Sequence, residues 1–478
     1  MPRLQDILVG VPIFLVGGAV RDVYRRWVPH DLDLVVAGDG RTWARKIANK
    51  LGGAYYALDD ERQVGRAIIV WDGENYVIDV SAQRGGTLLD DLTARDFTVN
   101  AIAASLTGDM QTLIDPLDGI GDLNQKRLRR CSPASISDDP VRVLRAIRQS
   151  VAFGFAIDRD TRQDLRHEGV RIPQLSVERV RDEFMTMLDG KTPHVALRVM
   201  DTLDLLKWIV PEIEPLRDRQ QNPPYGGSVW EQTLLTVEKL DGVLTTISPY
   251  RTDETAAEVG YGMIVYLLDR FRHPLQDHLA QPLPNGRTVP ALLVLAVLLH
   301  ETGTSAASLG ADSDPTAATL AEERAIALRL SNDEVTRLGA IVRHHARPRR
   351  LASRDDMPSR RDLHRFWNRT DGVGLDLCIF ALADYLGEVG TQLSAPDWIR
   401  FVERIGALLD AYFNQHDTVV APPPLVRGNT LMDALGMAPG PEVGRLLHAI
   451  EEAQAAGEIA TVDEAIALAR RELEHPSP

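Results

Sequence analysis

Hydrophobic and polar positions alternate in two different ways along the chain. In the N-terminal part, short apolar runs end at turn signals rich in glycine and aspartate, which is typical of β-strands joined by tight turns. The predicted strands cover residues 13–16, 32–36, 67–71 and 76–80. From about Pro140 onward, apolar residues recur every three or four positions, which predicts amphipathic helices. We therefore predict an α+β protein, with a small mixed α/β domain followed by an almost entirely helical remainder.

Length and loop composition predict more than one domain. The 478 residues exceed the size at which a single hydrophobic core usually stops growing. Stretches rich in proline, glycine and small polar residues mark possible boundaries, and they occupy residues 219–228, 281–287, 303–316 and 419–427. The chain is long enough for each domain to bury its own core.

The charge balance limits how the protein can contact nucleic acid. A net charge of −15 excludes the global basic balance of a protein that coats nucleic acid. Any contact with RNA would therefore depend on local patches, and arginine is concentrated in residues 126–148 and again in residues 343–365. Solvated helix faces are the commoner outcome for such charge runs, so both interpretations stay open.

Cysteine content and hydropathy indicate the cellular compartment. Cys131 and Cys378 are too few for a disulfide framework or a thiolate zinc site, which fits a reducing compartment. The N-terminus does not follow the pattern of a signal peptide. The longest strongly apolar run, residues 291–299, falls short of the ~20 residues that a membrane-spanning helix needs. We expect a cytoplasmic protein with no membrane partner, whose oligomeric state the sequence leaves open.

A glycine pair, Gly17 and Gly18, joins the first predicted strand to a predicted helix. Glycines let backbone N–H groups approach a phosphate closely, and a helix N-terminus favours an anion. Arg21, three residues later, is then placed to pair with a triphosphate. Tight turns also use glycine for purely steric reasons, so the turn alone is weak evidence for a nucleotide site.

Two carboxylates, Asp31 and Asp33, stand two residues apart at the start of an apolar strand, so both project from one face. Paired oxygens suit Mg²⁺. Such a pair can hold two ions, one lowering the pKa of an attacking RNA 3′-hydroxyl and one steadying a leaving pyrophosphate. An isolated Asp-x-Asp is more often a polar strand edge or an N-cap. Asp79, in another predicted strand, either completes the metal site or faces solvent.

The order of these features resembles the first signature of the tRNA CCA-adding enzyme and bacterial poly(A) polymerase family, within the polymerase-β-like nucleotidyltransferase superfamily. Residues 95–101, with the sequence Arg-Asp-Phe-Thr-Val-Asn-Ala, are similar to the family's ribose-recognition motif. The resemblance implies that Arg95, Asp96 and Asn100 surround the incoming sugar and favour ribonucleotides. Ala94 stands where the family often has a second arginine.

Residues 138–145, with the sequence Asp-Asp-Pro-Val-Arg-Val-Leu-Arg, resemble the family's nucleotide-templating motif, with Asp138 in place of the usual Glu. The resemblance places Asp139, Arg142 and Arg145 among the nucleotide-binding residues. A carboxylate acceptor and a planar guanidinium donor can address the Watson–Crick edges of cytosine and adenine without a nucleic-acid template. The same segment also reads as an N-cap followed by proline at the start of a basic helix, and both interpretations can hold together.

Two further signatures extend the resemblance. Residues 115–123 resemble the family's flexible connector, with Asp118 where the family usually has Gly, and residues 175–183 resemble the motif that braces the neck helices. The implied fold is a polymerase-β-like mixed-sheet nucleotidyltransferase head followed by an all-α neck, body and tail. We assign the head to residues 1–125, the neck to 126–218, the body to 219–418 and the tail to 419–478.

Some relatives carry a metal-dependent phosphohydrolase domain with a His, a His-Asp pair and a later Asp. Here His300 is followed by Glu301 instead of Asp, Gln232 stands where a ligand His would be expected, and Asp384 is a candidate for the last ligand. Glutamine replaces imidazole poorly at a divalent metal. We interpret the body as a degenerate HD-like domain that serves packing and RNA support.

The resemblance implies a function. We predict a Mg²⁺-dependent, template-independent RNA nucleotidyltransferase that adds C, C and A to tRNA 3′ ends from CTP and ATP and releases pyrophosphate. A poly(A) polymerase, or an enzyme that adds only CC or only A, would use the same motifs. A metal-dependent phosphohydrolase and a non-catalytic RNA-binding module are the alternatives from other classes.

Overall fold

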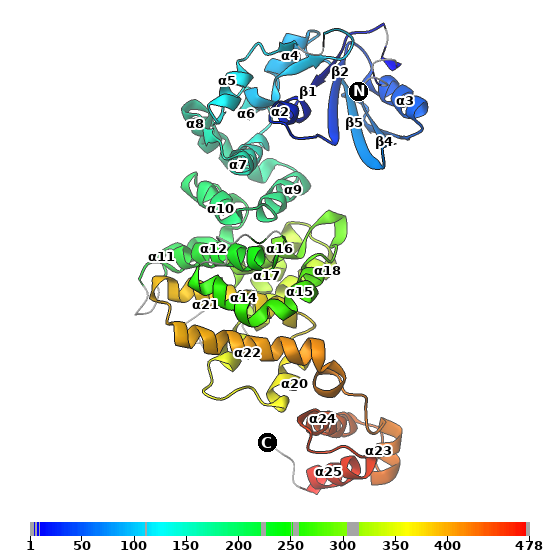
Figure 1. The fold of residues 1–478 in the computed structure, drawn as a ribbon, viewed down its shortest axis with the longest axis vertical. Coiled ribbons are helices and arrows are strands. Elements are labelled where there is room, and N and C mark those ends of the chain that lie inside the picture. Colours follow the sequence, from blue (N-terminus) through cyan, green and yellow to red (C-terminus); the bar gives the residue numbers. More distant parts are fainter. Residues whose placement is uncertain are drawn as a thin grey trace. The chain divides into compact units, whose positions relative to one another are not determined.

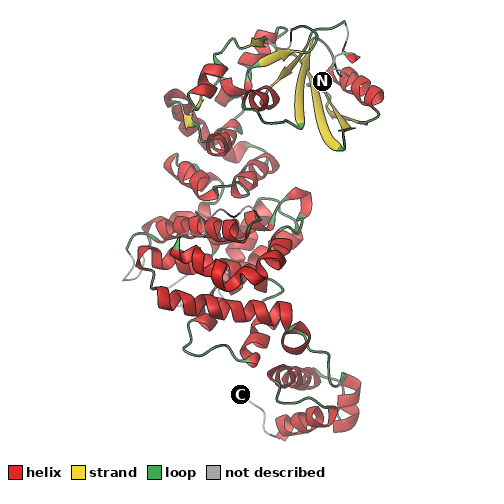
Figure 2. Ribbon diagram, viewed as in Figure 1, coloured by secondary structure: helices red, strands yellow, loops and turns green. Residues whose placement is uncertain are grey.

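A computed structural model gives the fold of the chain (Figure 1) and describes residues 4, 7–8, 10–109, 112–220, 226–249, 251, 258–303 and 315–474. The chain divides into two compact units. The first unit comprises residues 1–183 and 199–209, and the second comprises residues 184–198 and 210–478. Among the described residues, all named strands belong to the first unit and the second is helical, which confirms the predicted α+β class (Figure 2). The division into head, neck, body and tail stays a prediction.

A seven-stranded mixed sheet forms the first unit, in the order β3-β4-β5-β2-β1-β6-β7. Its strands are β1 (Ile13–Val16), β2 (Asp31–Val36), β3 (Ala54–Asp59), β4 (Val64–Trp71), β5 (Glu74–Ala82), β6 (Ala103–Ser105) and β7 (Leu113–Ile114). The four predicted strands are confirmed as β1, β2, β4 and β5. The sequence did not reveal β3, whose side chains are exposed or half-buried throughout, or β6 and β7, which are only three and two residues long.

Strand β2 lies in the middle of the sheet, antiparallel to β1 and parallel to β5. Leu32 and Leu34 are buried on one face, whereas Asp31 and Asp33 are exposed on the other. The period-two pattern therefore places both carboxylates on the same face, as predicted.

Short helices and turns connect the strands and extend the first unit. They are α2 (Gly18–Tyr24), α3 (Gly40–Leu51), α4 (Leu88–Thr93), η1 (Thr98–Asn100), α5 (Gly119–Asn124), α6 (Ser135–Asp138), α7 (Arg142–Phe153), α8 (Arg159–Glu168), η2 (Gly169–Gln174) and η3 (Leu206–Trp208), with a two-stranded sheet of β8 (Arg127–Leu128) and β9 (Ala156–Ile157). Helix α7 buries its apolar face and ends at Gly154, whose φ of 66° is the left-handed conformation that glycine adopts without strain. Helices α9 (Val177–Leu188) and α10 (Pro193–Thr202) contribute residues to both units.

The second unit is built from helices. They are η4 (Pro211–Ile213), α11 (Glu214–Asp218), α12 (Val229–Ile247), α14 (Val259–Leu268), η5 (Asp269–Phe271), α15 (Arg272–Leu279), η6 (Pro284–Gly286), α16 (Val289–Leu299), α17 (Pro315–Ala327), α18 (Asn332–His344), α19 (Ala346–Ala352), α20 (Arg360–Asn368), α21 (Gly374–Val389), η7 (Gly390–Gln392), α22 (Ala395–Asn414), η8 (His416–Val420), α23 (Gly428–Leu435), α24 (Pro441–Ala456) and α25 (Val462–Glu474). The apolar helix α16 is buried almost completely, and the Thr288 side chain caps its start. Within the described ranges no helix is both long and apolar enough to cross a membrane.

Candidate active site

A row of charged side chains crosses three neighbouring strands on the exposed face of the sheet. Asp33 on β2 lies opposite Asp79 on β5, and Asp79 lies opposite Arg66 on β4. Arg66 donates from Nε and Nη2 to the two oxygens of Asp79, both at 2.8 Å. Asp79 therefore shares a face with Asp33, but a guanidinium group already binds its carboxylate.

The environment of Asp33 disfavours its charge. Solvent reaches the side chain, yet the protein atoms around the carboxyl raise its pKa, and repulsion from Asp79 and Asp31 adds to the effect, while Arg95 opposes it. Repulsion between carboxylates on one face of the sheet raises the electrostatic energy of the folded protein, and a cation bound between them would remove this repulsion.

Gly17 brings the backbone against this carboxylate. Its φ is 74°, and a Cβ built on it would lie 2.8 Å from Asp33 Oδ2 and 3.3 Å from Arg95 Nη1. Both the backbone conformation and the close approach therefore require glycine. Gly18 begins helix α2, so the turn has the strand-glycine-helix form that the sequence predicted.

A buried polar network joins the predicted ribose-recognition residues to helix α7. The carboxylate of Asp96 accepts hydrogen bonds from the Phe97 backbone N–H at 2.8 Å, from Asn100 Nδ2 at 3.0 Å and from Arg145 Nε at 3.1 Å. Arg21 Nη1 donates to Asn100 Oδ1 at 2.6 Å. Burial alone would raise the pKa of Asp96, but Arg145 and these hydrogen bonds hold it below its usual value. Four of the predicted site residues are thus connected directly.

Arg95 is held in place by a residue that the sequence did not single out. The buried carboxylate of Asp91, one helical turn earlier, accepts hydrogen bonds from Arg95 Nε at 3.0 Å and from Nη2 at 2.9 Å. Because Arg95 Nη1 also lies close to Gly17, Asp91 aims this guanidinium at the glycine turn and at Asp33. The four-residue spacing of an Asp and an Arg at the end of α4 was the sequence signal for this pair.

Asp139 and Arg142, the two residues predicted to read the base, both have other hydrogen-bond partners in this structure. Arg142 is buried, and its Nη1 and Nη2 atoms donate to the backbone carbonyls of Ala94, Arg95 and Ser135 at 2.8 to 3.2 Å. Asp139 instead accepts a hydrogen bond from Arg179 at 2.7 Å. In this structure Arg142 therefore braces the segment that carries Arg95, and it needs to exchange carbonyl contacts before it can address a base.

Two more partners were missed in the sequence, Arg66 and Gln149. The two-residue turn at Asp72 and Gly73 fixes the register of β4 and β5, so counting back from this turn places Arg66 opposite Asp79. Gln149 accepts from Asn100 Nδ2 at 2.9 Å. It is buried on helix α7, and no local pattern in the sequence indicated this long-range contact.

The HD-like residues of the second unit do come together, but arginines engage their carboxylates. His300 Nε2 lies 3.8 Å from Asp384 Oδ1 and 3.9 Å from Glu301 Oε1. Arg349 donates to Asp384 at 2.9 Å, and Arg219 pairs with Glu301. His345 packs its ring against His300 at a centroid distance of 5.1 Å. Guanidinium groups thus supply the positive charge at the place where a hydrolase of this type would hold metal.

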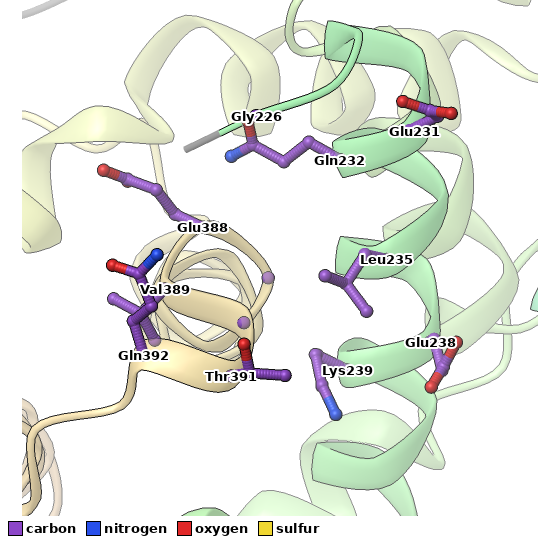
Figure 3. A pocket seen from close by; sticks show the side chains of 12 residues that line it. Gly226, Glu231, Gln232, Leu235, Glu238, Lys239, Glu388, Val389, Thr391 and Gln392 are labelled. Carbon is purple, nitrogen blue, oxygen red and sulfur yellow. The ribbon is translucent and has the colours of Figure 1, made fainter. Parts of the chain in front are cut away.

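A cavity of about 520 Å³ lies beside this cluster in the second unit, between α12 and the end of α21 (Figure 3). Gln232 and Leu235 extend into it from α12, and Glu388 lines the opposite side. Glu388 also pairs with Arg349. Gln232, at the position of the expected ligand His, therefore lines an open polar cavity and does not complete a set of metal ligands.

The mixed sheet, the glycine turn and the Asp-x-Asp pair on its central strand are the arrangement of a nucleotidyltransferase head. Residues 13–129 match the family model of the poly(A) polymerase head domain. Residues 154–216 match the model described as a probable RNA- and SrmB-binding site of polymerase A, and residues 400–469 match that of a putative second domain of tRNA nucleotidyltransferases.

Two curated relatives match the chain over nearly its whole length. The A-adding tRNA nucleotidyltransferase of Deinococcus radiodurans is 30% identical, over 96% of this chain and 94% of its own length. The CC-adding tRNA nucleotidyltransferase of Geobacter sulfurreducens is 28% identical, over 98% of this chain and 94% of its own. The chain belongs to the tRNA nucleotidyltransferase family and is an enzyme of that class.

Solved structures show the same fold. A CCA-adding enzyme in complex with ATP is 21% identical with a TM-score of 0.65, covering 98% of this chain and 93% of that one. The Thermotoga maritima CCA-adding enzyme complexed with tRNA_CCA is 20% identical with a TM-score of 0.59, covering 99% of this chain and 95% of that one.

The family implies dependence on a divalent metal, and the residues present fit such an ion. Asp31 and Asp33 expose carboxylate oxygens on one face, and desolvation of Asp33, together with repulsion from Asp79 and Asp31, raises its pKa. Within the described residues, no group of three or more His, Cys, Asp or Glu side chains is arranged to hold a metal by itself. A hard ion that takes one or two carboxylates and completes its shell with water and substrate phosphates suits this donor set.

The raised pKa of Asp33 predicts a gain in stability when its charge is removed. An aspartate whose folded-state pKa exceeds its ordinary value of about 3.9 destabilises the folded protein once it ionises, and the penalty fades as the pH falls toward that value. We expect Asp33→Asn to raise the thermal midpoint of metal-free protein at pH 7.5, and to raise it less at pH 5, when unfolding is followed by circular dichroism.

Glu61→Gln is the matched control, because Glu61 is an exposed carboxylate in the turn between β3 and β4. Adding divalent metal should raise the midpoint of the wild type and of Glu61→Gln, but not that of Asp33→Asn. A midpoint for Asp33→Asn that is below the wild type at both pH values would contradict the electrostatic description of this site.

Proposed function

We propose that the protein adds the nucleotides of the CCA end to tRNA 3′ ends, using CTP and ATP and releasing pyrophosphate. The observation that carries this proposal is the pair Asp31 and Asp33, exposed together on the central strand beside the Gly17 turn. Solved structures of the same fold are complexes of CCA-adding enzymes with ATP, CTP or tRNA_CCA, which supports the substrates.

In the proposed reaction, the 3′-hydroxyl oxygen of the tRNA attacks the α-phosphorus of CTP or ATP. A new P–O bond forms while the bond to pyrophosphate breaks. Asp31 and Asp33 would hold Mg²⁺, with Asp79 as a supporting carboxylate that Arg66 keeps in place. When bound, the metal supplies positive charge that lowers the pKa of the attacking hydroxyl and steadies the leaving pyrophosphate.

The remaining residues of the proposed nucleotide site fall into two groups. Gly17 and Gly18 leave the backbone N–H groups at the start of α2 accessible to the triphosphate. The guanidinium of Arg95 points to the same place. Asp96 and Asn100 form the sugar-binding wall, and Arg21 and Arg145 hold them in position. Because these side chains bond one another, the site is organised before the nucleotide arrives.

Addition of only part of the CCA end is the second candidate. The curated relatives that span the whole chain are named CC-adding and A-adding tRNA nucleotidyltransferases. Relatives named as multifunctional CCA or CCA-adding proteins match about two fifths of the chain. The identity of the added nucleotides therefore needs a direct measurement.

We assign the protein to the cytoplasm. Cys131 and Cys378 are free thiols, as expected in a reducing compartment. Burial raises the pKa of both thiols, so neither forms much reactive thiolate at neutral pH.

Incorporation assays test the proposed function. Purified protein is incubated with Mg²⁺ and tRNA that ends at its discriminator base, at C or at CC, together with CTP, ATP or both, and the 3′ ends are sequenced. We expect CTP to extend the first two substrates and ATP the third, and Asp31→Ala or Asp33→Ala to reduce incorporation by about 10³-fold or more, since both remove metal-holding oxygens.

The control is Glu61→Gln, which leaves the proposed site intact and should retain wild-type incorporation. Extension by CTP alone, or by ATP alone on the CC end, would assign a partial activity. A long ladder from ATP alone would identify a poly(A) polymerase. Full activity of both aspartate variants would contradict the proposed site.

Arg142 tests the proposed base selection. In the proposal Asp139 and Arg142 read the incoming base, which requires Arg142 to leave the carbonyls of Ala94, Arg95 and Ser135. We expect Arg142→Ala to lower the ratio of correct to incorrect nucleotide incorporation by about 5- to 150-fold, because one bidentate contact contributes about 1–3 kcal/mol of base discrimination. The ratio is measured from kcat/KM for CTP, ATP, UTP and GTP on each tRNA end. An equal loss for all four nucleotides would assign Arg142 to bracing alone.

A further inference from the structure

Four large side chains next to the carboxylate-bearing strand are exposed together. Tyr24 is 40% exposed and Trp27 50%, and Val23 and Val28 beside them are 53% and 73% exposed. The other exposed large hydrophobic residues are mostly scattered singly along the described chain. Clustered exposure of aromatic and apolar side chains on a folded protein marks an interaction surface.

The backbone presents these side chains in a fixed way. Helix α2 ends at Tyr24, and Arg26 then adopts a φ of 65°, the left-handed conformation that is uncommon for a residue with a side chain. The turn is closed by the Trp27 N–H, which donates to the Asp22 carbonyl at 2.8 Å. This turn places the Trp27 ring over Arg25, whose guanidinium carbon lies 4.1 Å from the indole centroid.

The cations of this surface have no salt-bridge partner in the part of the chain that the structure describes. Arg25 lies against the rings of Trp27, Phe153 and Phe155, and its Nη1 has no hydrogen-bond acceptor among the described residues. In the described part of the chain neither Arg25 nor Arg26 forms an ion pair. By contrast, arginines of both basic stretches in the sequence pair with carboxylates, as Arg129 does with Asp122 and Arg361 with Glu458. Unpaired arginines in a chain of net charge −15 indicate an anionic partner.

The surface is close to the proposed reaction centre. Trp27 precedes Asp31 by four residues, so their Cα atoms lie within about 14 Å of each other even in a fully extended chain. On the other side, Arg21 contacts the same Phe153 ring as Arg25 and donates to Asn100 in the proposed sugar-binding wall. The cluster of Arg21, Arg25, Trp27 and Phe153 therefore lies next to both the carboxylate-bearing strand and the proposed sugar-binding wall.

We propose that Tyr24, Arg26 and Trp27 bind the single-stranded 3′ end of the tRNA, with Trp27 stacking on a base, Arg26 facing the phosphates and Arg25 holding the indole ring in place. This inference rests on the proposed function and adds a primer-binding surface to it. Bases stack on aromatic rings with little dependence on sequence. A stacking surface thus suits a primer whose terminal base is not the same in all three additions, which a base-specific contact would not.

Single-turnover kinetics with tRNA ending at its discriminator base, at C and at CC test the surface. We expect Trp27→Ala to raise the KM for tRNA by about 5- to 100-fold, as for the loss of one stacked base. The KM for CTP and ATP and the rate at saturating tRNA should stay near the wild type. Trp27→Phe should recover most of the affinity, because it restores an aromatic face.

Tyr56→Ala is the matched control. Tyr56 is exposed to a similar extent, at 53%, but lies on β3 at the edge of the sheet. Its removal should leave the KM for tRNA unchanged. A tRNA carrying 2-aminopurine at its 3′ terminus gives a second readout, since stacking on the indole should quench its fluorescence with the wild type and with Trp27→Phe but not with Trp27→Ala.

Arg26→Gly separates the charge from the rings, because glycine adopts the positive φ of this position without strain. We expect the salt dependence of tRNA binding to weaken by about 0.7 in the slope of log K against log salt, the value for one phosphate contact on a single strand. An unchanged KM, unchanged quenching and an unchanged slope in these variants would overturn the primer surface. The failure of the wild type to extend any tRNA would instead overturn the proposed function.

Discussion

The proposed nucleotide site depends on the contacts of one buried carboxylate, that of Asp96. It is held by Arg145 from helix α7, by the backbone of Phe97 and by Asn100, and Asn100 in turn orients Arg21. A buried carboxylate without these partners would carry a large desolvation penalty, so this ion pair stabilises the packing of the segment between α4 and η1 against helix α7. The same contact fixes the proposed sugar-binding wall. The same residues therefore contribute to the packing of the first unit and to the organisation of the site.

On the sheet itself, function opposes stability. Asp33 lies beside Asp79 and Asp31 and has a raised pKa, and Gly17 approaches it so closely that no side chain fits between them. Arg66, Arg95 and Arg145 offset part of the negative charge. A protein selected for stability alone would neutralise this row, whereas a cation-binding site leaves part of its charge for the ion. The second unit shows the opposite outcome, because its acidic cluster is neutralised internally by arginine.

Sequence patterns predicted the parts of the site that depend on local geometry. Alternation along one strand placed Asp31 and Asp33 on a common face, and the glycine turn before α2 was recognised from its residues. Contacts between distant segments were not predictable in this way. No local sequence pattern indicated that Arg142 donates hydrogen bonds to the backbone carbonyls of Ala94 and Arg95, or that Asp139 pairs with Arg179. Strands with few buried side chains, such as β3, were missed because tertiary pairing and not pattern defines them.

The most direct test of this account locates the metal. Crystals of the protein are grown with Mn²⁺ in place of Mg²⁺ and with a non-hydrolysable CTP analogue, and anomalous scattering is measured at the manganese edge. The account predicts manganese within coordinating distance of carboxylate oxygens of both Asp31 and Asp33 and of the nucleotide phosphates. Manganese bound among His300, Glu301 and Asp384, with none at the aspartate pair, would contradict it.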